Sequence, residues 1–231
     1  MTESTLQGEV LHTTAGDFPL HEYRLGLGGR TWSILHSESV LSRDDEAHFL
    51  MELKERLPYG VVLWPAAIGL AHEVAARADD FRGSRVLELG AGTGLPGIVA
   101  ASLGARVVQT DRHELSMSVC RRNVERNGVG SIEHRLVDWA EWTDDARYDW
   151  IIGSDILYGE SVHPHLRRIF DVNLAPGGRI LLSDPFRAPS LRLLEAMEAE
   201  GWTIGMTKWS IGRDGAPRPI GIFELGPPRK D

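Results

Sequence analysis

The sequence contains a single cysteine, Cys120, and no long apolar run. One cysteine excludes an internal disulfide framework and is typical of a reducing compartment. The longest apolar stretch, residues 61–71, is interrupted by Pro65, and it is shorter than the roughly 20 residues that a membrane helix needs. The first ten residues carry acids where a signal peptide has a basic region. Together these absences predict a cytoplasmic protein with no membrane partner.

An excess of positive charge is also absent. The chain has 25 Lys and Arg against 33 Asp and Glu, a formal net charge of −8 at pH 7. This leaves no general basic field for a phosphate backbone, so a nucleic-acid partner is not expected, whereas a basic protein partner would be tolerated. The composition is otherwise globular, with 42% hydrophobic and 25% charged residues. A length of 231 residues fits one domain of ordinary size.

Residues 1–57 are expected to form an N-terminal extension that packs on the main domain. Strands at 21–27 and 30–36 form a hairpin, because the two glycines between them adopt positive φ at little cost. Ser42 is a good N-cap and has an aspartate three residues later, so we expect a helix from there to about Arg56.

Residues 58–231 are expected to form the main domain, in which helices and strands alternate. Strands are predicted at 85–89, 106–110, 132–137, 148–154, 179–183, 202–210 and 220–225, and helices at 66–77, 95–103, 115–127, 163–172 and 190–200. Repeated strand–helix units require a parallel sheet with right-handed crossovers. The loop between the last two strands is too short for a crossover, so one of them runs antiparallel. The sequence therefore predicts an α/β fold with a seven-stranded, mostly parallel sheet and helices on both faces.

A glycine loop follows the first strand of this sheet. Gly90, Gly92 and Gly94 alternate directly after the apolar residues 85–89. Alternating glycines let a ligand approach the backbone, and ligands bind at the carboxyl ends of parallel strands. A turn without a ligand would need only one or two glycines, so we interpret the loop as a binding site.

Two ligands suit this loop. The spacing from Gly92 to Gly97 also matches the dinucleotide fingerprint, and Asp111, at the end of the second strand, suits ribose hydroxyls in either a nicotinamide dinucleotide or S-adenosylmethionine. Glu88 favours the latter, because a carboxylate suits a cationic amino-acid portion better than a pyrophosphate. Asp138 and Trp139 would offer an acceptor and a flat surface to an adenine. The antiparallel pair of strands also departs from the usual dinucleotide-binding sheet.

These residues resemble the cofactor motifs of class I S-adenosylmethionine-dependent methyltransferases. The segments 63–67 (LWPAA), 94–98 (GLPGI) and 154–158 (SDILY) further resemble methyltransferase family 16, the seven-β-strand protein lysine methyltransferases, over roughly residues 58–185. In that family the segment at the fourth strand has the pattern Asp-x-x-Tyr or Asp-x-x-Phe, and Asp155 with Tyr158 fits this pattern. It also includes members reported to modify arginine.

The resemblance implies a Rossmann-like fold, S-adenosylmethionine as the cofactor, and methyl transfer to a side-chain nitrogen of a partner protein, with lysine favoured. It also implies that Trp64 covers the cofactor. The predicted cofactor-binding residues are Trp64, Glu88, Gly90, Gly92, Gly94, Asp111, Arg112, Asp138, Trp139 and Ser154.

Asp155 and Tyr158 are the candidate catalytic residues. Asp155 would orient the acceptor amine, stabilise its developing charge or accept a proton, and Tyr158 would cover the amine or methyl group. The structural alternatives are a helix N-cap for Asp155 and a pocket wall or core position for Tyr158. We also interpret Asp184 and Phe186, which follow the fifth strand, as substrate-groove residues.

Other candidates have simpler interpretations, and no metal is predicted. No acid or cysteine joins His163 and His165 at a spacing typical of metal ligands, so we interpret them as the start of a helix. Cys120 is interpreted as a core residue. Three arginines on the helix at 115–127 read as a solvated face, namely Arg121, Arg122 and Arg126. Three other functions stay open: a small-molecule methyltransferase with the N-terminal hairpin as a lid, a non-catalytic S-adenosylmethionine-binding module, and a dinucleotide oxidoreductase.

Overall fold

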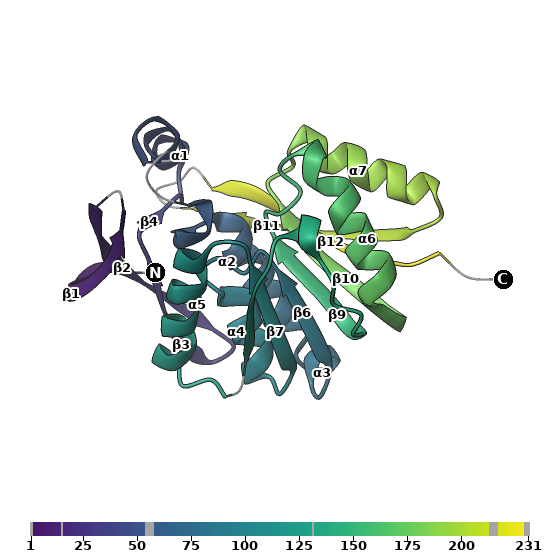
Figure 1. The fold of residues 1–231 in the computed structure, drawn as a ribbon, viewed down its shortest axis with the longest axis horizontal. Coiled ribbons are helices and arrows are strands. Elements are labelled where there is room, and N and C mark those ends of the chain that lie inside the picture. Colours follow the sequence, from purple (N-terminus) through teal and green to yellow (C-terminus); the bar gives the residue numbers. More distant parts are fainter. Residues whose placement is uncertain (1, 15, 54–57, 131, 213–216, 229–231) are drawn as a thin grey trace.

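A seven-stranded sheet forms the centre of the computed structural model, which describes residues 2–14, 16–53, 58–130, 132–212 and 217–228 (Figure 1). The strand order is β11-β12-β10-β9-β6-β7-β8. In chain order the strands are β6 (Arg85–Leu89), β7 (Arg106–Asp111), β8 (Glu133–Leu136), β9 (Tyr148–Ser154), β10 (Leu174–Asp184), β11 (Thr203–Ile211) and β12 (Arg218–Gly226). All pairs from β10 to β8 are parallel, whereas β12 runs antiparallel to β10 and β11. The predicted fold is therefore confirmed, including its one antiparallel strand.

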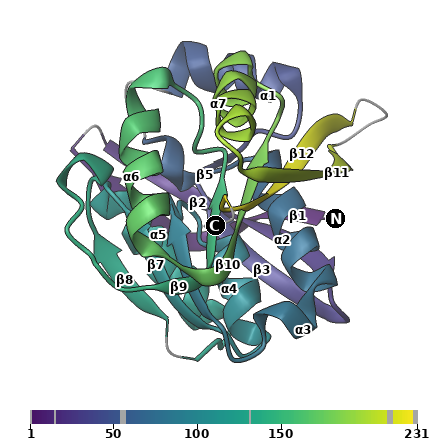
Figure 2. The same ribbon diagram turned by 90° about the vertical axis from the view of Figure 1, so that its right-hand side faces the viewer.

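Helices cover both faces of the sheet (Figures 1 and 2). One face carries α2 (Pro65–Ala76), α3 (Ala78–Phe81), α4 (Leu95–Ser102) and α5 (Glu114–Arg126), and the other carries α6 (His163–Asn173) and α7 (Ala188–Ala199). Side chains of a strand alternate between the two faces. Val86 accordingly packs in the core under α2 and α4, while Leu87 and Leu89 pack in the core under α6 and α7. In the described part of the chain, no helix has both the length and the apolar character required to cross a membrane.

The N-terminal residues build a separate antiparallel sheet. Its strands are β1 (Thr2–Thr13), β2 (Gly16–Leu27) and β3 (Arg30–His36). The predicted hairpin is present between β2 and β3, and Gly28 and Gly29 take φ of 61° and 73° at its turn. β1 was not predicted from the sequence, and β2 begins five residues before the predicted start at residue 21.

A short helix, α1 (Arg43–His48), follows this sheet. Its start is the predicted one, because Ser42 Oγ accepts a hydrogen bond from Asp45 N (3.0 Å) and Asp45 Oδ2 accepts one from Ser42 N (2.7 Å). The chain continues as a π-helix over Phe49–Leu53, and the predicted end near Arg56 lies outside the described residues. Strands β4 (Glu38–Ser39) and β5 (Val62–Leu63) then pair in parallel, with a 3₁₀ turn at Tyr59–Val61 before β5.

Asn123 of α5 and Asn127, the C-cap residue of that helix, bind the N-terminal sheet to the main domain. Asn127 accepts a hydrogen bond from Ser33 N (3.0 Å) and donates one to Ser33 O (2.8 Å). Asn123 does the same for Leu35, at 2.6 and 3.0 Å, and its Nδ2 also donates to Thr93 O in the glycine loop (2.8 Å). The side-chain amides thus take the place of a neighbouring strand along β3, and they satisfy backbone groups that would otherwise be buried without partners.

Candidate active site

The glycine loop between β6 and α4 has the backbone that its sequence predicts. Gly90, Gly92 and Gly94 take φ of 63°, 55° and 81°, a conformation that other residues rarely adopt. Space is short as well: a Cβ on Gly94 would lie 2.5 Å from Cys120 Sγ, and a Cβ on Gly90 would lie 3.0 Å from Ile156 Cγ2. The loop therefore requires glycine both for its conformation and for its packing.

Glu88 lies beneath this loop, on the side of the sheet covered by α4. Gln109 Nε2 donates to Glu88 Oε2 (2.6 Å) and to Gly94 O (2.9 Å), and Cys120 Sγ donates to Gln109 Oε1 (3.1 Å). Burial raises the pKa of Glu88 to about 7, although the hydrogen bonds from Gln109 and the Gly97 backbone oppose this rise. Glu88 Oε1 has no hydrogen-bond partner among the described residues. The carboxyl group therefore braces the loop from below, and it keeps one acceptor free.

Asp111 ends β7 and binds the same loop. Its Oδ2 accepts a hydrogen bond from Gly92 N (3.0 Å) and its Oδ1 accepts one from His113 N (2.9 Å). Burial raises the pKa of Asp111, and these backbone hydrogen bonds oppose the rise. The turn at Tyr59–Val61 lies against this point, since a Cβ on Gly92 would be 3.1 Å from the Gly60 carbonyl oxygen. The structure thus brings together two predicted site residues that lie 19 positions apart.

A cavity of about 470 Å³ opens beside this point, at the carboxyl ends of β7 and β8. Arg112 and Asp138 line it and form an ion pair at 3.9 Å. Asp138 Oδ1 also accepts a hydrogen bond from Ala140 N (2.9 Å), which caps the 3₁₀ turn at Trp139–Glu141. Trp139 reaches back to the loop, where a Cβ on Gly90 would be 3.3 Å from its Cζ2. The structure thus places Arg112, Asp138 and Trp139 beside the glycine loop.

Trp64 belongs to an aromatic cluster with Tyr59 and Phe49. It precedes α2, and its Nε1 donates to Tyr59 O (3.0 Å). Its ring stacks on Tyr59 at 5.9 Å and meets Phe49 edge-on at 5.7 Å. Tyr59 and Phe49 were not among the predicted site residues, although an aromatic residue at position 59, directly before Gly60 in the turn, was a visible signal.

Asp155 follows directly after β9 in a left-handed conformation, with φ of 57°. Its backbone N–H donates to Ser183 O (2.8 Å), so the strained conformation is held by β10. The alternative of a helix N-cap is wrong, because the next helical turn begins at Glu160 and its N-cap position is Gly159. Ser154 is half-buried and pairs in register with Ser183.

The Asp155 carboxylate forms an ion pair with Arg187, which was not among the residues predicted for the site. Arg187 Nη2 lies 3.1 Å from Asp155 Oδ2, and Nη1 contacts Oδ1. Asp184 positions the arginine: its Oδ1 accepts from Arg187 N (2.6 Å), while its Oδ2 accepts from Ser190 Oγ (2.7 Å). Asp184 is fully buried, so its interpretation as a substrate-groove residue is wrong.

Tyr158 is 48% exposed, whereas Phe186 is part of a packed edge. Burial raises the pKa of Tyr158; Arg112 opposes the rise, and Asp111 and Asp138 add to it. Phe186 takes a φ of 65°, and its ring meets Phe223 edge-on at 6.0 Å.

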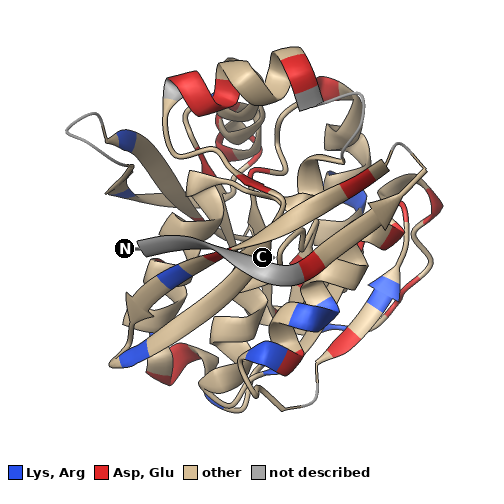
Figure 3. Ribbon diagram, turned by 90° about the vertical axis from the view of Figure 1, so that its left-hand side faces the viewer, with Lys and Arg blue, Asp and Glu red and all other residues tan. Residues whose placement is uncertain are grey.

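The remaining candidates are structural. Cys120 is buried, and His163 starts α6 with its Nε2 at 3.2 Å from Leu157 O. Across the described ranges, no three His, Cys, Asp or Glu side chains gather to hold a metal ion. Acidic and basic positions are interspersed on the face that carries the N-terminal sheet (Figure 3).

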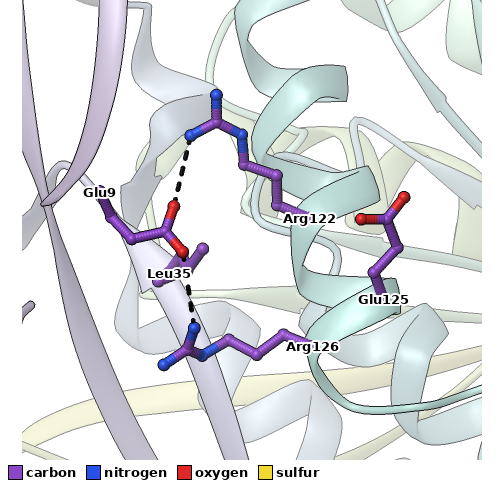
Figure 4. A pocket seen from close by; sticks show the side chains of 5 residues that line it. All are labelled: Glu9, Leu35, Arg122, Glu125 and Arg126. Atoms are coloured by element: carbon purple, nitrogen blue, oxygen red, sulfur yellow. Dashed lines mark ion pairs between the residues drawn. The ribbon is translucent and has the colours of Figure 1, made fainter.

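The interpretation of the α5 arginines as a solvated face is wrong for two of them. Arg122 and Arg126 lie 3.5 and 3.6 Å from the two carboxylate oxygens of Glu9 in β1, across a cavity of about 320 Å³ (Figure 4). Arg126 also lies 3.3 Å from the buried Glu22. These ion pairs join β1 and β2 to α5, which the sequence could not show because β1 was not predicted.

Comparison with known proteins finds similarity to one family over much of the chain. The model of a family described as lysine methyltransferase matches residues 44–189, more than half of the sequence. Protein N-lysine methyltransferase METTL21A from Xenopus tropicalis is 37% identical over 145 residues, which cover 59% of this chain and 67% of that protein. Histone-arginine methyltransferase METTL23 from Xenopus laevis is 33% identical over 140 residues, which cover 57% of this chain and 58% of that protein.

A solved structure confirms the fold. Magnesium protoporphyrin IX methyltransferase from Synechocystis PCC 6803, with bound SAH, superposes with a TM-score of 0.53 at 17% identity and covers 69% of this chain and 81% of that one.

Proposed function

The chain belongs to the lysine methyltransferase family, and on this premise we propose that it transfers a methyl group from S-adenosylmethionine to a side-chain nitrogen of a partner protein, with lysine as the favoured acceptor. Family membership confirms the cofactor expected from the glycine motif and decides the ambiguous fingerprint against a dinucleotide. The single, buried cysteine supports a cytoplasmic location.

The residues around the loop fit this cofactor. The positive-φ glycines give the loop its conformation, Asp111 would hold the ribose hydroxyls, and Asp138 with Trp139 would hold the adenine. Trp64 would cover the cofactor from the side of α2. When bound, the cofactor supplies an electrophilic methyl group on a positively charged sulfur.

The placement of Asp155 is the observation on which the proposal rests. Its neighbour Ile156 packs directly on the glycine loop, since a Cβ on Gly90 would lie 3.0 Å from Ile156 Cγ2. Asp155 therefore stands beside the methyl donor's loop, on a backbone fixed by Ser183. A carboxylate there would accept a hydrogen bond from the acceptor amine and orient its lone pair for in-line displacement, which is where most of the rate enhancement arises in such reactions.

Lysine is favoured over arginine by the relatives. The family model carries lysine in its description, and the METTL21A sequence named for lysine is more similar than the METTL23 sequence named for arginine, at 37% against 33% identity. We also propose that residues 1–57 form an extension integral to the methyltransferase domain, since Asn123 and Asn127 bind β3 and the family match already begins at residue 44.

The proposal is tested by incubating the protein with a cell lysate and S-adenosylmethionine labelled in its methyl group. A labelled protein band with methyl-lysine after hydrolysis is the expected result. Label confined to small molecules would favour a small-molecule methyltransferase, and cofactor binding without transfer would favour a non-catalytic module.

Asp155→Asn then tests the role of the carboxylate. We expect S-adenosylhomocysteine affinity to stay within about threefold while turnover falls about 10²-fold or more. Asp171→Asn, an exposed position on α6, is the matched control and should keep full turnover. Full activity of Asp155→Asn on the labelled substrate would contradict the role of Asp155.

A further inference from the structure

Arg187 is an arginine held inside the proposed acceptor site. It lies between β10 and α7, as the N-cap residue of α7, and its side chain is 27% exposed. Its guanidinium faces both oxygens of Asp155, a two-point geometry that fixes the relative orientation of the two groups. The Asp155 side chain is itself only 10% exposed, so the pair is shielded from bulk water.

Charged groups from four elements surround this guanidinium. Asp155 follows β9, and Asp184 ends β10 with its Oδ2 at 3.6 Å from Arg187 Nη1. Glu46 of α1 and Arg218 of β12 also act on the guanidinium electrostatically, with opposite signs. Glu46 and Arg218 are paired with each other at 2.7 Å. Burial lowers the pKa of Arg187, but a guanidinium stays charged at every physiological pH.

This pairing bears on a requirement of nitrogen methylation. A lysine ammonium has no lone pair, so it must lose a proton to solvent before its nitrogen can attack. In the transfer, the neutral nitrogen forms a bond to the methyl carbon while the carbon–sulfur bond breaks and its electron pair stays on sulfur. The products are a methylated ammonium and a neutral thioether. An isolated carboxylate would stabilise the unreactive ammonium and oppose the loss of its proton.

We propose that Arg187 is a positioning residue that neutralises Asp155, so that the site accepts the nitrogen in its uncharged form while Asp155 still receives the hydrogen bond that orients it. The proposal rests on the function proposed above. It assigns the arginine a role that acts through Asp155 and through the charge of the acceptor, without contact to the cofactor.

The first test measures binding of n-butylammonium, which carries the lysine side-chain charge, to the S-adenosylhomocysteine-bound protein by NMR titration. We expect Arg187→Gln to bind n-butylammonium about tenfold more tightly than the wild type, because the carboxylate has lost its internal partner. Arg187→Lys should stay near the wild type, and binding of uncharged n-butanol should not change. Arg192→Gln, which removes an exposed arginine paired with Glu160 on the surface, is the matched control.

The second test is the pH profile of methyl transfer to the labelled protein substrate. In Arg187→Gln we expect the rising limb of kcat to move up by about one pH unit and KM at pH 7 to fall, and Arg187→Lys should restore both. A merely structural role would raise KM and leave the limb in place. A folded Arg187→Gln variant that binds n-butylammonium no better than the wild type would overturn the proposal. Absence of methyl transfer by the wild type would overturn the proposed function instead, and the n-butylammonium comparison would still decide the role of Arg187.

Discussion

Replacing Glu88 by glutamine should stabilise the protein at alkaline pH. The folded chain raises the pKa of this carboxyl from 4.5 to about 7, chiefly because the group is buried. Between these values the folded state keeps a proton that the unfolded state has lost, so the free energy of unfolding falls as pH rises through this window. The gap between the two values corresponds to a loss on the order of 3 kcal/mol by pH 8. Because glutamine cannot ionise, the free energy of unfolding of the variant does not include this loss.

The assay is urea unfolding of the wild type and Glu88→Gln at pH 4.5 and pH 8. The stability difference between the two proteins should shift in favour of the variant by about 3 kcal/mol from the lower to the higher pH. Taking the difference at each pH cancels the titration of all other groups. Glu195→Gln, at an exposed position on α7, should show no comparable shift. If the stability difference between the two proteins is equal at both pH values, folding does not raise the pKa of Glu88, and the prediction is refuted.

Three further predictions concern the loop and the N-terminal sheet. Asp111→Ala should weaken S-adenosylhomocysteine binding by about 1–3 kcal/mol in calorimetry, and a change of a few tenths would remove Asp111 from the site. Asn123→Ala should lower the free energy of unfolding by about 2–3 kcal/mol in urea, because it leaves buried backbone groups of Leu35 and Thr93 without partners; Asn173→Ala on α6 serves as a comparison with no link to the loop. Burial raises the pKa of Glu22, but hydrogen bonds from Ser33, Arg24 and Arg126 outweigh it and lower the value to about 2, so its stabilisation is full above pH 4.5 and is lost as pH falls towards 2. Glu22→Gln should therefore cost on the order of 3 kcal/mol at pH 7 and progressively less in melts below pH 4.5; an equal cost at pH 7 and pH 3 would contradict this.

The sequence predicts the centre of the main sheet well because strands such as β6 and β9 are short, largely apolar segments. The ends of β6 and β9 match the predicted residues, and α2, α4, α5, α6 and α7 begin and end within two residues of their predicted bounds, whereas the short α3 was not predicted. β10 begins at Leu174, earlier than predicted, because the Pro176-Gly177-Gly178 segment that reads as a turn lies within the strand, across a register shift between Leu174 and Arg179. β1 was missed because a polar segment such as residues 2–13 becomes a strand only through its pairing with β2.

The site is predictable to a lesser extent. Alternating glycines and an acid at the end of a strand can be recognised in the sequence, which explains why Gly90 and Asp111 were predicted. Arg187 and Gln109 left none, because their importance arises from partners 32 and 21 residues away along the chain. No local pattern records such a contact.

The double hydrogen bond of Asn123 Nδ2, to Leu35 O in β3 and to Thr93 O in the glycine loop, makes the N-terminal sheet and the cofactor loop parts of one cooperative unit. A bound cofactor that orders the loop at Thr93 would also raise the free energy needed to open β3. Backbone amides of the N-terminal sheet should therefore exchange with deuterium more slowly when the cofactor is bound. The coupling between two binding sites is reciprocal, so it also holds for a partner that binds the N-terminal sheet. A partner that binds β1–β3 changes the affinity for the cofactor by the same factor by which the cofactor changes the affinity for that partner.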